Sequence, residues 1–79
     1  MTMSRAYILI SVKNPGDVKA TVNHLSKKKG VVSAEVTFGP YDIIAVIEAQ
    51  DLKDLSSTVI NDLYDVDDVQ GSITCIVTE

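Results

Sequence analysis

The sequence predicts an α+β fold whose strands and helices follow one another in the order β-α-β-β-α-β. Four segments rich in β-branched and other apolar residues predict strands. Two segments between them repeat apolar residues at the spacing of a helix. Turn-forming residues, chiefly glycine, proline and aspartate, separate the six. The length of 79 residues suits one domain, which we expect to cover residues 1–79.

The first strand is expected over residues 5–12, where isoleucine, leucine and valine favour an extended chain. Residues 14–17, Asn-Pro-Gly-Asp, then mark a turn. The first helix follows over residues 17–28 and stops before Gly30. The apolar stripe of this helix consists of Val18, Val22 and Leu25.

The second strand is expected over residues 31–38, in which apolar and polar residues alternate. Residues 39–42, Gly-Pro-Tyr-Asp, form a turn, and the third strand covers residues 43–49. The second helix begins after Asp51, its N-cap. The buried stripe of that helix is expected to be Leu52, Leu55, Val59 and Leu63.

The last strand is expected over residues 71–77. A polar loop precedes it, marked by Asp65, Asp67 and Asp68. The complete order is that of the split βαβ, or ferredoxin-like, sandwich. It implies a four-stranded antiparallel sheet with two helices on one face and with the first and third strands in the centre.

The two central strands are apolar on both faces, although helices can cover only one of them. The uncovered side of these strands carries Tyr7, Leu9, Ile44 and Val46. The same side of the outer strands is expected to carry Ser33, Glu35, Thr37, Ser72 and Thr74. An apolar centre with polar flanks is typical of an interface, so we expect dimerisation through this face. The alternative is that the four central residues are single exposed apolar groups.

The composition excludes several classes of function. The net charge is -4, from 7 basic and 11 acidic residues, which argues against direct binding of nucleic acid. The three consecutive lysines, residues 27–29, are read as favourable charges at the end of a helix. Neither a signal peptide nor a membrane span is expected, and a cytoplasmic location fits the single cysteine. Cys75 is expected in the core, and no residue set suggests a metal or another cofactor.

The residues of the central turn lead to a known family. Gly39-Pro40-Tyr41-Asp42 matches a Gly-x-Tyr-Asp turn between strands two and three, and Gly30 with the following valine opens strand two. With a threonine in the last strand, these features make the whole chain similar to the C-terminal ligand-binding domain of the Lrp/AsnC regulators, also called the RAM domain. One departure is Asp68-Val69, where the family usually has Gly-Val. The family's helix-turn-helix is not found in these residues, so the resemblance does not imply binding of DNA.

The resemblance implies a regulatory module that senses a small molecule. Its members pair their sheets face to face, as a dimeric α/β barrel, and join dimers into larger rings. Small effectors, commonly amino acids, bind between dimers near the Gly-x-Tyr-Asp turn. On this basis the candidate ligand-binding residues are Gly39, Tyr41, Asp42 and Thr74. A full-length Lrp/AsnC regulator is a further candidate partner, through the shared interface.

The chemistry of the turn agrees with such a site. Gly39 lets the backbone approach a ligand, and Asp42 could accept hydrogen bonds from an α-ammonium group. The structural alternative is a tight turn in which Asp42 only bonds its own backbone.

Two other functions stay open. One is a small dimeric ferredoxin-like enzyme, of the monooxygenase or isomerase type, which would need an acid–base group in an apolar cleft. His24, the only histidine, lies off the apolar stripe of its helix and is expected to face solvent, so we expect no enzyme. The other is a purely structural oligomer without a ligand.

Overall fold

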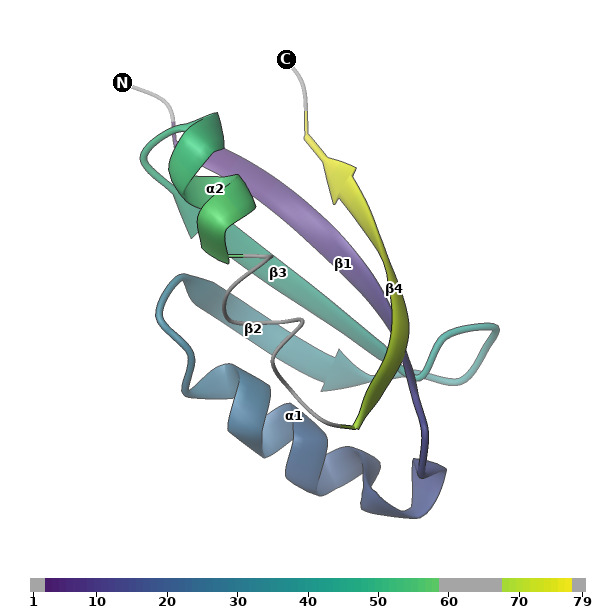
Figure 1. Cartoon of the computed structure of the whole chain (residues 1–79). Coiled ribbons are helices and arrows are strands. Elements are labelled where there is room, and N and C mark those ends of the chain that lie inside the picture. Colours follow the sequence, from purple (N-terminus) through teal and green to yellow (C-terminus); the bar gives the residue numbers. More distant parts are fainter. Residues whose placement is uncertain (1–2, 59–67, 78–79) are drawn as a thin grey trace.

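The computed structural model describes residues 3–58 and 68–77, shown in Figure 1. Val59, Leu63, Asp65 and Asp67 lie outside the described residues, so their expected places on the second helix and the following loop are not addressed. The strands are β1 (Ser4–Val12), β2 (Val31–Val36), β3 (Ile43–Ala49) and β4 (Val69–Ile76). The helices are the 3-10 turn η1 (Pro15–Asp17), α1 (Val18–Ser26) and α2 (Leu52–Thr58).

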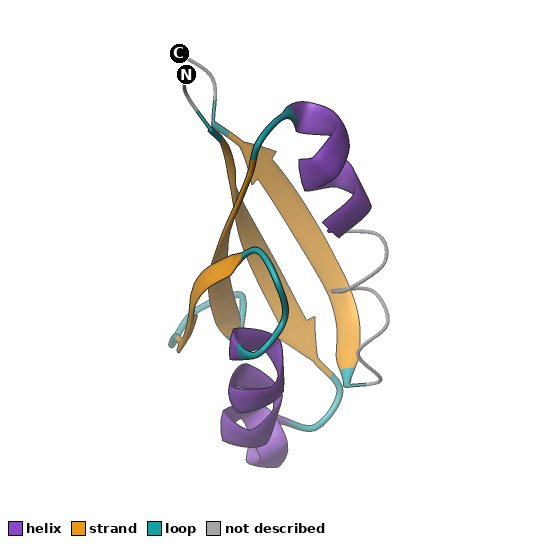
Figure 2. Cartoon of the chain, turned by 90° about the vertical axis from the view of Figure 1, so that its left-hand side faces the viewer, coloured by secondary structure: helices purple, strands orange, loops and turns teal. Residues whose placement is uncertain are grey.

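The four strands form one antiparallel sheet in the order β2-β3-β1-β4. This is the ferredoxin-like order, and it confirms that the first and third strands are central. Both helices lie on the same side of the sheet, and the other side carries no helix in the described part of the chain (Figure 2). The predicted fold class is therefore confirmed.

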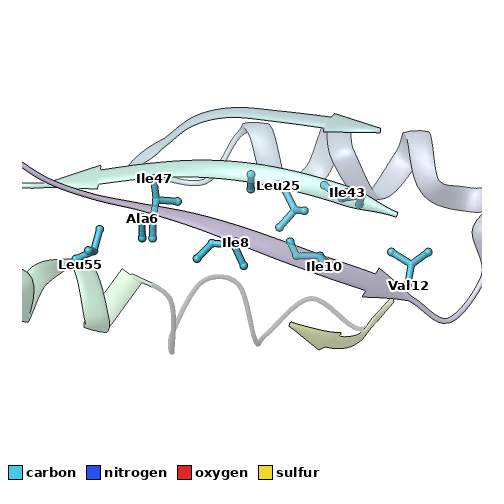
Figure 3. Packing of buried hydrophobic residues seen from close by; sticks show 9 residues of the cluster. Ala6, Ile8, Ile10, Val12, Leu25, Ile43, Ile47 and Leu55 are labelled. Carbon is cyan, nitrogen blue, oxygen red and sulfur yellow. The ribbon is translucent and has the colours of Figure 1, made fainter. Parts of the chain in front are cut away.

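The core lies between the sheet and the helices, and it follows from the alternation of side chains along a strand. Every second residue of β1, from Ala6 to Val12, is buried, and so is every second residue of β3 from Ile43 to Ile47. Leu25 of α1 and Leu55 of α2 close the core from the helical side (Figure 3). The buried apolar residues are Ala6, Ile8, Ile10, Val12, Leu25, Ile43, Ala45, Ile47 and Leu55.

The first helix differs in detail from the prediction. Its expected first turn is the separate 3-10 turn η1, closed by a bond of 2.9 Å from the backbone N–H of Asp17 to the carbonyl of Asn14. Its last turn tightens in the same way, because the N–H of Lys28 donates to the carbonyl of Leu25 at 3.0 Å. Gly30 then takes a φ of 90°, which glycine adopts without strain.

The polar residue Thr21 is buried against the core, although the apolar pattern of the sequence did not predict it there. Thr21 of α1 is buried, whereas Val18 and Val22 of the predicted stripe are half-buried. The hydroxyl of Thr21 donates to the Asp68 carboxylate at 2.7 Å. A threonine can occupy the buried face of a helix when its hydroxyl has such a partner.

Asp68 ties the start of β4 to the segment that leaves β1. Its carboxylate accepts hydrogen bonds from the Thr21 hydroxyl and, at 3.2 Å, from the backbone N–H of Asn14. Its backbone carbonyl accepts a third from the N–H of Lys13 at 2.8 Å. The aspartate that departs from the family pattern therefore has a structural role at this junction.

We expect Asp68→Ala to lower the free energy of unfolding by about 1–2 kcal/mol. The Thr21 hydroxyl would keep only the Asp17 carbonyl, at 3.3 Å, and the exposed Asn14 N–H would lose its bond to the carboxylate. Urea unfolding would measure the change. The control is the double-mutant cycle with Thr21→Val. Because both single changes remove the same hydrogen bond, the double variant should lose less stability than the sum of the two. Additive losses would show that the bond does not contribute.

Candidate functional site

Thr37 stabilises the turn between β2 and β3 by two hydrogen bonds across it. The Thr37 N–H donates to the Asp42 carbonyl at 2.9 Å, and its hydroxyl donates to the Tyr41 carbonyl at 2.8 Å. Gly39 has a φ of 154°, and a Cβ there would meet no atom within 4 Å. The turn therefore requires glycine for its backbone conformation, whereas the space around it would admit a side chain or a ligand.

Asp42 clamps this turn to the central strand β1. Its backbone N–H donates to the Ile10 carbonyl, and one carboxylate oxygen, Oδ2, accepts a bond from the Val12 N–H, both at 2.9 Å. In the alternative drawn from the sequence, the Asp42 carboxylate bonds only its own backbone. In the structure it accepts instead from the backbone of Val12, which is thirty residues away in the chain. Ligand binding by Asp42 would have to use its second oxygen, Oδ1, or rearrange this clamp.

The structure brings three of the four predicted ligand-binding residues together and separates the fourth. Gly39, Tyr41 and Asp42 share one turn, which lies beside the end of β1. Thr74 pairs with Ile8, in the middle of β1, and faces the helical side of the sheet. Within one chain, Thr74 is thus not part of the turn.

The predicted dimer residues all lie on the face that the helices leave uncovered, which we call the open face. Tyr7 lies directly opposite Val46, and Leu9 directly opposite Ile44. Tyr7 is 39% exposed, and the other three are half-buried. Cross-strand neighbours of this kind form one continuous apolar surface.

The outer strand β4 does not follow the prediction. Its register places Ile73 opposite Leu9 and Cys75 opposite Tyr7, so both lie on the open face and both are exposed. The expectations that Cys75 lies in the core and that Ser72 and Thr74 line the open face were wrong.

The error has a physical reason. Alternation along a strand shows which residues share a face, but the pairing with β1 decides which face that is. The alternation of Ile73 and Cys75 with polar residues is visible in the sequence, and apolar residues usually face a core, which favours the helical side for both. Instead they extend the apolar surface of the open face to the edge of the sheet.

An ion pair between Arg5 and Glu48 borders the open face where β1 begins and β3 ends. Arg5 donates through Nε to a carboxylate oxygen of Glu48 at 2.8 Å, and a second guanidinium nitrogen contacts the same oxygen. The hydrogen bond to Glu48, followed by one to Tyr7, raises the pKa of Arg5 above its ordinary value. Arg5 therefore keeps its charge at the rim of the apolar surface.

A cavity of about 500 Å³ lies at the end of the sheet opposite the Gly39–Asp42 turn. It contains none of the predicted ligand-binding residues. Its walls come from the loop after α1, the end of β3 and helix α2, and its lining residues are Met3, Lys29, Gly30, Glu48, Ala49, Gln50, Asp54, Ser57 and Thr58.

The one histidine of the chain lies at the surface. His24 is exposed on α1, as the sequence predicted. Within residues 3–58 and 68–77, no three histidine, cysteine or carboxylate side chains lie close enough together to hold a metal ion. None of the helices in the described part of the chain is long and apolar enough to cross a membrane.

Comparison with known proteins adds a family and a set of shared folds. The family model described as the Lrp/AsnC ligand binding domain matches residues 5–79. The structure of AsnC from E. coli is similar to this chain with 25% identity and a TM-score of 0.88, over 96% of this chain and 51% of AsnC. This chain therefore spans about half the length of AsnC. No curated protein matches the sequence.

Two further solved structures are informative. The hypothetical protein PHS023 from Pyrococcus horikoshii shares 27% identity and a TM-score of 0.89, over 98% of this chain and 92% of that protein. The transcriptional regulator NMB0573 from Neisseria meningitidis, solved in complex with L-Met, has the same fold. Its TM-score is 0.82 at 21% identity, over 96% of this chain and 50% of that one.

The clamp formed by Asp42 makes a testable prediction. Asp42→Ala should lower the free energy of unfolding by about 1–3 kcal/mol, because the Val12 N–H loses a charged acceptor. Asp42→Asn keeps an oxygen at the same place and should recover most of that loss. Thermal or urea unfolding of both variants would measure the difference. Equal stability of the alanine variant and the wild type would show that the clamp does not hold in solution.

Proposed function

Because this chain belongs to the Lrp/AsnC ligand-binding domain family, we propose that it is a small-molecule sensing and oligomerisation module that acts in transcription regulation. The observation that carries this proposal is the match of the family model to residues 5–79, nearly the whole chain. The Gly-x-Tyr-Asp turn, which the resemblance first pointed to, is present as an ordered structure clamped to β1.

The effector that suits the turn best is an amino acid or a similar small zwitterion. The Asp42 carboxylate uses Oδ2 for the Val12 N–H, and none of the hydrogen bonds described for residues 3–58 and 68–77 involves Oδ1. An α-ammonium group could therefore donate to Oδ1 while the clamp stays in place. The open space at Gly39 admits the ligand, and Tyr41 supplies apolar area with a polar tip. The regulator from Neisseria meningitidis, with its bound L-Met, supports this class of ligand.

We place the site at a junction between copies of the chain. Thr74 lies away from the turn within one chain, on the helical side of β4. A hydroxyl from Thr74 can reach the ligand only if a second copy brings it there. The proposed site is therefore complete only in an assembly of dimers, which gives a ligand control over that assembly.

The dimer itself is proposed to form through the open face. Tyr7, Leu9, Ile44 and Val46 form an apolar centre, and Ile73 with Cys75 continues it to the sheet edge. A chain of this length buries a small core, so pairing of two apolar faces is a natural source of stability. A full-length regulator of the family could offer the same face. E. coli AsnC has this fold in about half of its length, which makes such a regulator a candidate partner.

A non-enzymatic role is part of the proposal. The matched family is a ligand-binding domain of regulators, and the one histidine is exposed on the outer side of α1. An enzyme of the dimeric ferredoxin-like type would need a proton-transfer group in an apolar cleft. The cavity at the end of the sheet is lined by Lys29, Asp54 and other polar groups in contact with solvent, and it is not a cleft of that kind.

The ligand prediction is best tested with Asp42→Asn, which keeps the acceptor for Val12 and removes the charge. We expect at least one of the twenty amino acids to give binding heat with the wild type and to shift its assembly. A tenfold shift in the assembly constant requires about 1.4 kcal/mol of differential binding. The asparagine variant should lose both effects and keep its fold. Calorimetry and sedimentation measure the two readouts, and the sensing proposal fails if no amino acid produces either.

The dimer prediction concerns the centre of the open face. Replacing Leu9 and Val46 together with aspartate should give monomers, because two buried charges on each face oppose pairing. Val32→Asp is the control, since Val32 is an exposed apolar residue on the edge strand β2. Light scattering measures the mass of each variant. A double variant that remains a folded dimer would place the interface elsewhere.

A further inference from the structure

We call residues 37–42 the tip of the β2–β3 hairpin, and the cavity at the opposite end of the sheet the end cavity. We propose that the tip docks, through Phe38, into the end cavity of a second copy of this chain. The proposal deepens the proposed function and rests on it in one respect, the sheet-face dimer that carries two tips and two cavities. The contact itself would join dimers head to tail and would place the Gly39–Asp42 turn at each junction.

The first observation is the exposure of Phe38. It is the only phenylalanine of the chain, and its relative exposure is 105%, which leaves it without cover from the rest of the protein. The tip that presents it is ordered, because the neighbouring Thr37 bonds both Tyr41 and Asp42 across the turn. A fully exposed aromatic side chain on a hydrogen-bonded turn is the kind of residue that anchors interfaces.

The second observation is the cavity of about 500 Å³, which has room for an aromatic ring. Its walls combine apolar surface from Met3 and Ala49 with the charged groups of Lys29 and Asp54. Gly30 keeps the floor open, since a Cβ there would lie 3.4 Å from the Glu48 carbonyl and from a Thr58 methyl group. The Lys29 ammonium could lie over the face of an inserted ring.

The positions of tip and cavity exclude a contact within one chain. Strand β1 runs between them: Ser4 pairs with Ala49 at the cavity end, and Ile10 accepts the bond from Asp42 at the turn end. Figure 1 shows the hairpin turn projecting at the end of the sheet away from α2 and both chain ends. The protein extends 40 Å along its longest axis. Only another molecule can therefore fill the cavity with Phe38.

A second copy is the occupant that the structure favours, because one chain presents both the tip and the cavity. Such a contact joins two different surfaces, so it repeats and builds a ring or a filament. One phenylalanine buries only about 150–250 Å², which makes a single contact weak. A sheet-face dimer holds two tips and two cavities, and paired contacts between dimers strengthen one another.

The test is complementation between two variants, followed by sedimentation over a range of concentrations. Phe38→Ala removes the tip anchor, and Gln50→Trp fills the cavity from an exposed position at its wall. Val32→Ala and Lys53→Trp are matched controls, because both residues are exposed and neither belongs to the tip or the cavity. Asp54→Trp replaces Gln50→Trp if circular dichroism shows that the latter fails to fold.

We expect the wild type and both controls to assemble beyond the dimer. Each test variant alone should need at least about tenfold more protein to do so. An equal mixture of the two should assemble more readily than either variant alone, because the tips of one meet the cavities of the other. It should remain weaker than the wild type, since only half of the wild-type contacts can form. Variants that assemble like the wild type, a mixture that stays dimeric, or a wild type that never exceeds a dimer would each overturn the proposal.

Calorimetry separates this proposal from the sensing function. If amino acids bind the wild type but the Phe38→Ala variant assembles as the wild type does, the docking proposal is wrong and the sensing proposal stands. If assembly depends on Phe38 and follows the complementation pattern while no amino acid binds, the docking contact stands and the sensing function fails.

Discussion

The antiparallel pairing of β1 with β3 is the constraint on which the rest of the structure depends. Both strands are apolar over their paired central residues, 6–10 in β1 and 43–47 in β3. Their register places Ile8 opposite Ala45 on one face and Leu9 opposite Ile44 on the other. Residues of the first face are buried beneath the helices. Because side chains alternate along a strand, the same pairing necessarily creates an apolar surface on the second face. The fold and the surface proposed for dimerisation are thus two consequences of one register.

Two aspartates organise the end of the sheet where the proposed ligand site lies. As the chain leaves β1, the N–H groups of three consecutive residues meet acceptors from distant parts of the chain. Asp42 accepts from Val12, and Asp68 accepts from Lys13 through its carbonyl and from Asn14 through its carboxylate. The hairpin turn, helix α1 and the start of β4 therefore meet at one place.

The arrangement suggests how sensing and assembly could share one small domain. The open face, the hairpin turn and the end cavity occupy different parts of the surface, so each can serve a separate contact. A ligand at the turn would act where copies of the chain meet rather than inside one of them. Its effect would come from a difference in affinity between the assembled and the separate forms.

Sequence reasoning determined the order of the elements, the central place of the first and third strands, and the residues on the two faces of those strands. These features follow from local periodicity and turn chemistry, which adjacent residues express directly. Thr21 escaped this reasoning because its hydroxyl is satisfied by Asp68, a partner 47 residues away. The family resemblance pointed to the Gly39–Asp42 turn, but not to the bond between Asp42 and Val12.

Only the tertiary structure decided the facing of β4. Its alternation of Ser72, Ile73, Thr74 and Cys75 is plain in the sequence, yet the two possible orientations fit that alternation equally well. The pairing of Tyr7 with Cys75 selects one of them and turns the apolar residues outward. The distance between the Asp42 turn and Thr74, and the position of Phe38 and the cavity at opposite ends, were decided in the same way. Contacts between residues far apart in the chain depend on register and packing, and local sequence carries no record of either.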